Sequence, residues 1–308
     1  MSAISVKGLT KKFKTFTAVN DLSFDVVENH VVGFLGPNGA GKTTTLRMLV
    51  GLSKPTNGTA SIAGVPVTFG DAASNEKVGY LPEMPSFYAW MTGIEYMRFI
   101  SDLFDIPKSV SEKNIAELLR LVDLTEARSR KISSYSGGMR QRLGIAQALV
   151  NDPEVLILDE PVSALDPFGR KEVLDVIQKL KKTKTILFST HILSDVDRVC
   201  DDIVLIDKGK LISASPLSDL KAKYAAQILE IEFVSDPTKL LVKLKEQKWA
   251  KKVEKNGNLV RIWLIGNDVM TENTPLQFFA KENIGVLRYG LNLPETEDLF
   301  MQLIGGKE

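Results

Sequence analysis

The residues most able to do chemistry lie in one eight-residue loop, 36–43, with the sequence GPNGAGKT. Four residues separate Gly36 from Gly41, and Lys42 and Thr43 follow Gly41 directly. This spacing is typical of loops that cradle phosphate. Backbone N–H groups of such a loop converge on phosphate oxygens, the lysine reaches the β- and γ-phosphates, and the hydroxyl ligates Mg²⁺. The loop therefore predicts binding of a nucleoside triphosphate. The residues expected to contact it are Gly36, Pro37, Asn38, Gly39, Ala40, Gly41, Lys42, Thr43 and Thr44.

The segments on either side of the loop are suited to position it. The apolar run 31–35 (VVGFL) predicts a buried strand, and 44–49 (TTLRML) predicts a helix,. The N-terminus of that helix adds a partial positive charge close to the phosphates. Strand, glycine-rich loop and helix in this order form the Walker A arrangement.

Two carboxylates follow a second apolar run, 155–158 (VLIL). The run predicts a buried parallel strand, so Asp159 and Glu160 would emerge at the edge of the sheet where ligands bind in α/β proteins. Asp159 is placed to hold the Mg²⁺ shell, and Glu160 to polarise the attacking water. The alternative is a pair of solvated carboxylates that close a strand, which is a common arrangement when no phosphate loop precedes it.

Two further segments carry candidate contacts. The sequence Ser136-Gly137-Gly138 opens a helix-like stretch and could form a second anion site, although alone it is also an ordinary turn and N-cap,. His191 follows the apolar run 185–188, so it too is expected at the ligand-binding edge,. An imidazole there can hydrogen-bond the γ-phosphate and respond to its loss.

With these motifs the chain resembles the ATP-binding cassette (ABC) family over residues 4–215. The stretch 134–138 (SYSGG) resembles the family's signature loop, 163–166 (SALD) resembles its D-loop, and His191 its switch histidine. The resemblance implies an α/β P-loop NTPase domain at 1–215 with a helical signature subdomain at about 84–150. It also implies ATP and Mg²⁺ as cofactors. Its implied catalytic residues are Glu160, His191 and Lys42, its metal ligands Thr43, Glu83 and Asp159, and its further ATP contacts Ser136, Gly137, Gly138 and Asp166.

Two positions leave alternatives within this resemblance. Phe13 stands where the family places an aromatic residue that stacks on adenine, with Phe16 as a close competitor and a buried core phenylalanine as the structural alternative,. Glu83 fills the position where a glutamine commonly contacts Mg²⁺ and the reacting water. A carboxylate is also a hard oxygen ligand, but it adds negative charge beside the phosphates.

Composition is that of a globular intracellular protein. Charged residues make up 25% of the chain and the formal net charge is +1,. A single cysteine, Cys200, excludes an internal disulfide, and no signal peptide is evident,. No apolar stretch approaches the roughly 20 residues that span a bilayer. We therefore expect a cytoplasmic enzyme, peripheral on the cytoplasmic face of the membrane, whose transport channel is a separate chain.

A docking surface for such a permease is predicted just after Glu83. The segment 84–91 (MPSFYAWM) is rich in aromatic and methionine side chains, which are enriched at interfaces,. Phe87, Tyr88 and Trp90 are the docking candidates. The alternative is that the aromatic residues form the core of the helical subdomain, and this is partly expected of Tyr96, together with Met97 and Phe99.

Beyond residue 215 the nucleotide motifs stop, and 216–308 is predicted to be a small α+β accessory domain. The order β (227–234), α (237–247), β (250–255), β (258–264), α (274–283), β (285–290) is the βαββαβ of a ferredoxin-like fold, with a hairpin at Asn256-Gly257 and a closing helix near 295–304,. The lysine-dense stretch 243–252 could contact nucleic acid or anionic lipid, but a solvated helix face is favoured, since glutamate interrupts it and the net charge of the chain is near zero,. No nucleic-acid partner is expected.

This C-terminal addition resembles those of ABC-2-type exporter ATPases and favours export. One chain carries one Walker set and one signature loop, and in the family ATP lies between two cassettes, so a homodimer or heterodimer is expected. The predicted function is the ATP-hydrolysing subunit of an ABC transporter. The alternatives are a soluble ABC ATPase acting on a ribosome or DNA machine, and a non-catalytic ATP-binding regulator.

Overall fold

The computed structural model describes residues 2–70, 74, 76–163, 165–225, 228–265, 274–282 and 284–291. The chain divides into two compact units, Met1–Pro216 and Leu217–Glu308, and each is described by itself. Within the described ranges, none of the helices combines the length and apolarity that crossing a membrane requires.

The first unit is built around a mainly parallel sheet of six strands in the order β10-β9-β3-β8-β7-β6. Only β10, at one edge, is antiparallel to its neighbour. The inner strands β3, β7 and β8 are buried along their whole length because both faces of the sheet are covered,. The strands are β3 (Val31–Leu35), β6 (Val78–Leu81), β7 (Val155–Leu158), β8 (Thr185–Thr190), β9 (Asp202–Asp207) and β10 (Lys210–Pro216).

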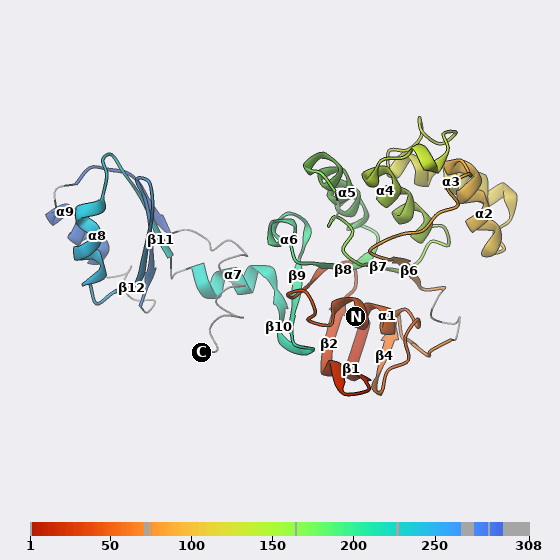
Figure 1. Ribbon diagram of the computed structural model, residues 1–308, viewed down its shortest axis with the longest axis horizontal. Coiled ribbons are helices and arrows are strands. Elements are labelled where there is room, and N and C mark those ends of the chain that lie inside the picture. Colours follow the sequence, from red (N-terminus) through yellow and green to blue (C-terminus); the bar gives the residue numbers. More distant parts are fainter. Residues whose placement is uncertain are drawn as a thin grey trace. The chain divides into compact units, whose positions relative to one another are not determined.

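A second, antiparallel sheet of the order β2-β1-β4-β5 covers one face of the first. Helix α1 (Lys42–Leu49) lies beside this sheet, and its residues Leu46 and Leu49 share a core with Phe34 of β3 and Ile62 of β4 (Figure 1). The strands of this sheet are β1 (Ser2–Phe13), β2 (Phe16–Val27), β4 (Asn57–Ile62) and β5 (Val65–Pro66).

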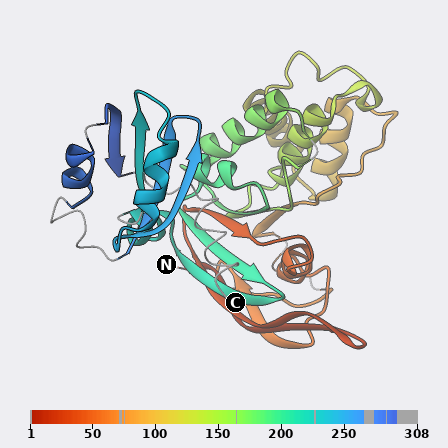
Figure 2. The same cartoon turned by 60° about the vertical axis from the view of Figure 1, so that its left-hand side comes forward.

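Helices cover the opposite face of the six-stranded sheet, as Figures 1 and 2 show. Helix α2 begins with a capping box, in which Thr92 and Glu95 exchange hydrogen bonds with each other's backbone N–H groups,. The predicted helical subdomain contains α2, α3, η1 and α4. The helices of this unit are α2 (Gly93–Leu103), α3 (Lys108–Leu121), the 3₁₀ turn η1 (Ile132–Ser134), α4 (Gly137–Ala148), α5 (Pro167–Leu180) and α6 (Leu193–Val199).

The second unit contains an antiparallel sheet in the order β12-β13-β11-β14. This order, with α8 and α9 between strands, confirms the predicted ferredoxin-like βαββαβ arrangement, including a turn at Asn256-Gly257. The predicted elements do not include α7, and the predicted helix near 295–304 lies outside the described residues. The elements are α7 (Leu217–Ala225), β11 (Ile228–Phe233), α8 (Thr238–Lys245), β12 (Ala250–Asn256), β13 (Leu259–Leu264), α9 (Thr274–Lys281) and β14 (Val286–Leu291).

Candidate functional site

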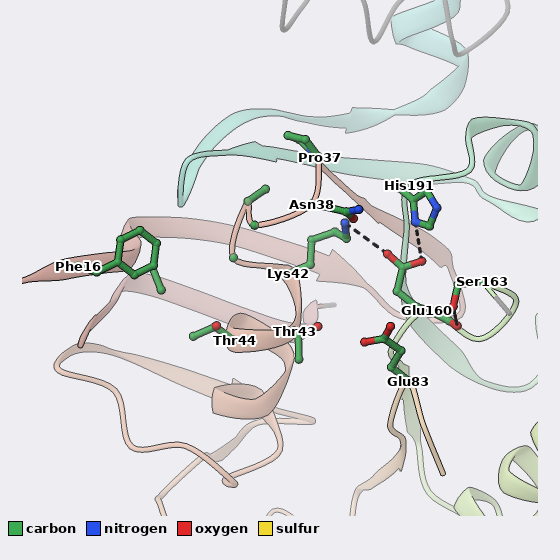
Figure 3. A pocket seen from close by; sticks show the side chains of 14 residues that line it. Phe16, Pro37, Asn38, Lys42, Thr43, Thr44, Glu83, Glu160, Ser163 and His191 are labelled. Carbon is green, nitrogen blue, oxygen red and sulfur yellow. Dashed lines mark hydrogen bonds and ion pairs between the residues drawn. The ribbon is translucent and has the colours of Figure 1, made fainter. Parts of the chain in front are cut away.

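A pocket of about 420 Å³ opens over the phosphate loop of the first unit. Figure 3 shows the loop and helix α1 on one side and the ends of β7 and β8 on the other. Residues far apart in the sequence meet here because the parallel strands deliver them to one edge of the sheet. The pocket is lined by Phe16, Ala18, Pro37, Asn38, Gly39, Ala40, Gly41, Lys42, Thr43, Thr44, Glu83, Glu160, Ser163 and His191.

The loop curls tightly because two glycines allow close backbone approaches. A Cβ on Gly36 would lie 2.4 Å from the carbonyl oxygen of Ile206. Gly41 has φ +104°, and a Cβ there would lie 2.5 Å from the carbonyl oxygen of Ala18,. The buried Lys42 ammonium closes the curl by donating to the Gly36 carbonyl at 2.7 Å. These contacts place the loop and the start of α1 at the pocket wall.

Glu160 lies at the centre of the pocket's charged groups. Its Oε1 is 3.3 Å from Lys42 Nζ, and its Oε2 is 3.0 Å from His191 Nδ1 (Figure 3). The Glu160 side chain is 8% exposed, whereas that of His191 is 44% exposed. Glu160 also has φ +47°, a backbone conformation that side chains other than glycine adopt rarely and at some cost,. The carboxylate is therefore held inside the pocket between a cation and an imidazole.

Asp159 is held below the loop by two hydroxyl groups. Its Oδ1 accepts from Thr43 at 3.2 Å and from Ser189 at 2.7 Å. Its Oδ2 is buried and has no hydrogen-bond partner among the described residues. A hydroxyl beside a carboxylate with one free oxygen is a set of hard oxygen donors, which Mg²⁺ prefers. Thr43 and Asp159 thus fit a magnesium ion.

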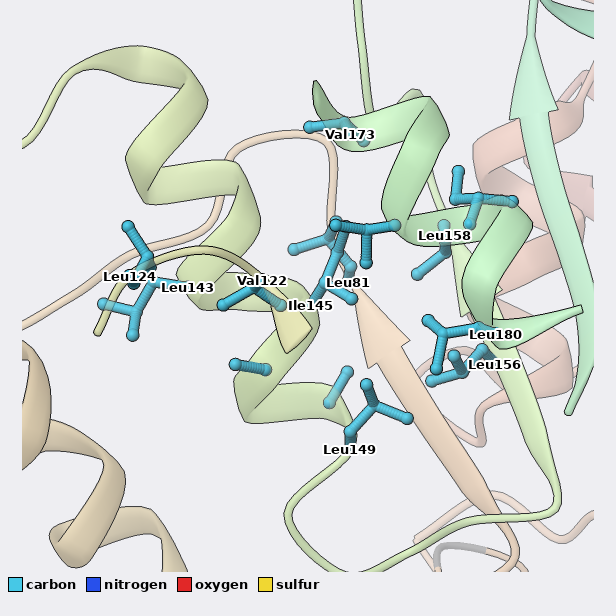
Figure 4. Packing of buried hydrophobic residues seen from close by; sticks show 14 of the residues in the cluster. Leu81, Val122, Leu124, Leu143, Ile145, Leu149, Leu156, Leu158, Val173 and Leu180 are labelled. Atoms are coloured by element: carbon cyan, nitrogen blue, oxygen red, sulfur yellow. The ribbon is translucent and has the colours of Figure 1, made fainter. Parts of the chain in front are cut away.

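Strand β7, which ends directly before these carboxylates, has apolar packing on both faces. Leu156 and Leu158 pack with the helices, beside Leu81 of β6 and Leu143 of α4 (Figure 4). Val155 and Ile157, which alternate with them along the strand, belong to the other apolar cluster, the one that contains Phe34. Close packing on both faces gives Asp159 and Glu160, which follow the strand, defined positions,.

Ser189 was not predicted from the sequence as a site residue. Its hydroxyl donates to Asp159 and accepts from the backbone N–H of Glu160 at 2.8 Å. It therefore connects the end of β8 with both carboxylates at the end of β7. The sequence offers one signal for this role. Ser189 is a polar residue that directly follows the apolar run 186–188 and lies two residues before His191. Ser163, whose hydroxyl donates to the Glu160 carbonyl at 3.2 Å, also lines the pocket without having been predicted to.

The aromatic candidates flank the turn between β1 and β2. Phe13 and Phe16 are paired across this hairpin, and Phe16 is the one that lines the pocket. Phe13 is half exposed, with the ammonium of Lys11 5.0 Å from its ring centroid. The structure thus brings the competitor Phe16, and not Phe13, to the pocket wall. A role for Phe13 in stacking on adenine stays a prediction.

Glu83 also reaches the pocket, from the segment after β6. It lines the same pocket as Glu160, and Figure 3 shows it below Glu160 in that view. Tyr80 lies three residues earlier on β6, and burial raises the pKa of its phenol, with a smaller contribution from the Asp159 carboxylate.

The signature residues and Asp166 do not line this pocket. Ser136 is the N-cap of α4 and accepts from the Met139 N–H at 3.2 Å, and Gly137 and Gly138 form the first turn of that helix. Asp166 is the N-cap of α5 and accepts from the Gly169 N–H at 2.7 Å. Ala164, in the segment that resembles the D-loop, lies outside the described residues.

The aromatic segment after Glu83 is divided between core and surface. Tyr88 and Trp90 are 50% and 68% exposed, and their ring centroids are 6.1 Å apart. Phe87 is half-buried and packs edge-on against the buried Tyr96 at 5.1 Å. Of the three docking candidates, Phe87 therefore contributes to the core of the helical subdomain as well.

Taken together, the pocket offers a backbone anion cradle, one buried ammonium, a hard oxygen pair and a carboxylate beside an imidazole. The cradle and ammonium suit a polyphosphate, and the carboxylate is within the pocket where it can accept a proton from water. This is the chemistry of hydrolysing a terminal phosphoryl group.

Comparisons with known proteins give the same result. Residues 19–163 match the family described as "ABC transporter". The chain is 38% identical to the uncharacterized ABC transporter ATP-binding protein YxlF of Bacillus subtilis, covering 98% of this chain and 99% of that protein. It is 34% identical to Nod factor export ATP-binding protein I of Burkholderia orbicola, covering 99% and 98%. Among solved structures, the dimeric bacterial ABC transporter cassette MJ0796 is 25% identical with a TM-score of 0.62, covering 70% of this chain and 98% of that one.

Proposed function

Because the chain belongs to the ABC transporter ATP-binding proteins, which are ATPases, we propose that it is the subunit that powers export through a separate membrane permease. The observation that carries the proposal is the contact of Glu160 with both Lys42 and His191 in a pocket over a complete phosphate loop. Export is favoured because a relative matched over nearly its full length is named as a Nod factor export protein. The soluble and non-catalytic alternatives have no comparable support.

In the proposed reaction Lys42 and the loop N–H groups bind the triphosphate. Glu160 accepts the proton of the attacking water, and His191 hydrogen-bonds the γ-phosphate. Thr43, Asp159 and Glu83 would hold Mg²⁺, which neutralises charge on the phosphate oxygens when bound. Phe13 or Phe16 would stack on the adenine.

The subunit is further proposed to work as a dimer. Ser136, Gly137, Gly138 and Asp166 lie at the starts of α4 and α5, outside the pocket of their own chain. They would complete the site of a second copy or a related cassette, and the solved cassette MJ0796 is a dimer. The unit 217–308 would be an accessory domain, and Tyr88 and Trp90 would contact the permease on the cytoplasmic face of the membrane.

The test is to use Glu160→Gln as bait. We expect this variant to bind ATP, to lose hydrolysis by a factor of about 100 or more, and to remain dimeric with ATP, because the base is gone while the phosphate contacts stay. Hydrolysis by purified protein, ATP binding and mass spectrometry of co-purified membrane proteins are the measurements. Turnover at the wild-type rate would refute the role of Glu160, and recovery of ribosomes in place of a multi-spanning membrane protein would refute the transporter proposal.

A further inference from the structure

The guanidinium of Arg170, on helix α5, donates hydrogen bonds to two side chains of helix α6. Its Nε donates to Asp195 Oδ1 at 2.6 Å, and its Nη2 donates to Ser194 Oγ at 2.7 Å. Both acceptors belong to the first turn of α6, three and four residues after His191. A planar guanidinium can hold two acceptors in fixed directions, which a lysine ammonium cannot do equally well.

The carboxylate end of this contact is buried. Asp195 is 1% exposed, and burial raises the pKa of its carboxyl, whereas the contact with Arg170 acts in the opposite direction. Hydrogen bonds between charged groups in such surroundings are shorter and stronger than exposed ones. The first turn of α6 is therefore fastened to α5 at this point.

His191 lies in the short turn that this contact restrains. Strand β8 ends at Thr190, whose hydroxyl accepts from the Ile192 N–H at 3.0 Å, and α6 begins two residues after His191. The His191 side chain is 44% exposed, so packing does not fix it, yet its Nδ1 is 3.0 Å from Glu160. Its position depends on the backbone anchors on either side, namely β8 and the first turn of α6.

The same turns of α5 also contact helix α4. Glu172 lies 3.2 Å from Nη2 of the buried Arg142. A Cβ on Gly138 would lie only 3.3 Å from the Cα of Gly169, so the two helix starts meet through glycines. Helix α5 thus connects the turn that carries His191 with the helix that begins at Ser136.

We propose that Arg170 is a positioning residue for ATP hydrolysis, which holds the turn bearing His191 against α5 and, through α5, in register with the start of α4. Arg170 does not line the pocket and acts through His191. The inference rests on the proposed role of His191 in the reaction.

The chain offers a matched control for the test. Arg198 Nη2 donates to Asp175 Oδ1 at 2.7 Å, and this contact also joins α6 to α5, but at the other end of α6. Arg170→Met and Arg198→Met each remove one ion pair between the same two helices. The Arg198 pair is more exposed, so its loss is expected to cost less stability, and the two variants are therefore compared by kcat at a temperature where both are folded,.

The first measurement is ATP hydrolysis by the full chain. We expect Arg170→Met to lower kcat at least tenfold with less than a twofold change in the Kd for ATP, and Arg198→Met to stay within twofold of wild type in both. Because Arg170→Met leaves a buried carboxylate without its cation, Asp195→Asn is made as a second variant that keeps the shape of the side chain. Thermal unfolding establishes that each variant is folded at the assay temperature.

The second measurement uses the two histidines of the chain, His30 and His191, as probes. In histidine-labelled protein, Arg170→Met and Asp195→Asn are expected to shift the ring resonances of His191 and to leave those of His30 unchanged. His191→Ala assigns the signals. Wild-type kcat in Arg170→Met and Asp195→Asn, or a loss of kcat with unmoved His191 resonances, would overturn the inference. Wild-type turnover of His191→Ala would instead refute the proposed role of His191, which separates the two failures.

Discussion

Glu83 brings a second carboxylate to the pocket that Glu160 lines, and Asp159 lies nearby against Thr43. Its place on the pocket wall fits the proposal that it supplies an oxygen to Mg²⁺. A carboxylate attracts a divalent cation more strongly than an amide of the same size does. The residue is thus expected to matter for the metal more than for the nucleotide.

Glu83→Gln should therefore raise the Mg²⁺ concentration for half-maximal hydrolysis several-fold, because one anionic ligand becomes neutral. The measurement is ATPase activity across a Mg²⁺ titration at saturating ATP. Glu126→Gln removes an exposed carboxylate elsewhere in the same unit and should leave the midpoint unchanged. An identical Mg²⁺ midpoint in Glu83→Gln would remove Glu83 from the proposed ligand set.

Single residues were predictable from sequence where a motif fixes them in one loop. The stretch Pro37 to Thr44 lines the pocket as expected, as do Glu83, Glu160 and His191. Ser189 and Ser163 were missed, because a serine near a strand end has many ordinary roles and its partner lies on another strand. The choice between Phe13 and Phe16 could not be made from sequence, since it depends on the turn of a hairpin.

Elements were predictable where periodicity and turn residues agree. The strands and helices of the second unit follow the predicted order, with the Asn256-Gly257 turn between β12 and β13. The contacts of α5 with α4 and α6 were not predictable, because they join side chains and glycines that no local pattern connects. At this scale the helices also carry much of the stability, since their apolar faces form one core with β7.

Leu143→Ala tests the contribution of that core. The side chain is fully buried on α4, and its truncation is expected to lower the free energy of unfolding of the first unit by about 2–5 kcal/mol through lost contacts and a cavity,. Chemical denaturation is the measurement. Leu103→Ala removes the same atoms from a 65% exposed position on α2 and should cost about 0.5 kcal/mol or less,. Equal effects of the two substitutions would contradict this account of the packing.

The whole molecule is proposed to act as a pair, since the signature residues lie outside their own pocket. Ser136→Arg in the Glu160→Gln background should bind ATP with unchanged affinity yet fail to dimerise, because a bulky cation at the start of α4 blocks the second cassette. Analytical ultracentrifugation with and without ATP is the measurement. Ser109→Arg, an exposed position on α3, is the matched control. Dimerisation of the Ser136→Arg variant would show that another surface joins the subunits.

The 3.3 Å contact of Glu160 with Lys42 bears on the timing of catalysis. Each of the two residues has one partner in this pair and another in the proposed reaction, phosphate for the lysine and water for the carboxylate. Neither can serve both partners fully at once. As phosphate takes the place of Glu160 beside the ammonium, the carboxylate is released to contact the attacking water. Binding of the substrate would then also release the Glu160 carboxylate from Lys42. The base would become available only when a phosphate is present to be hydrolysed.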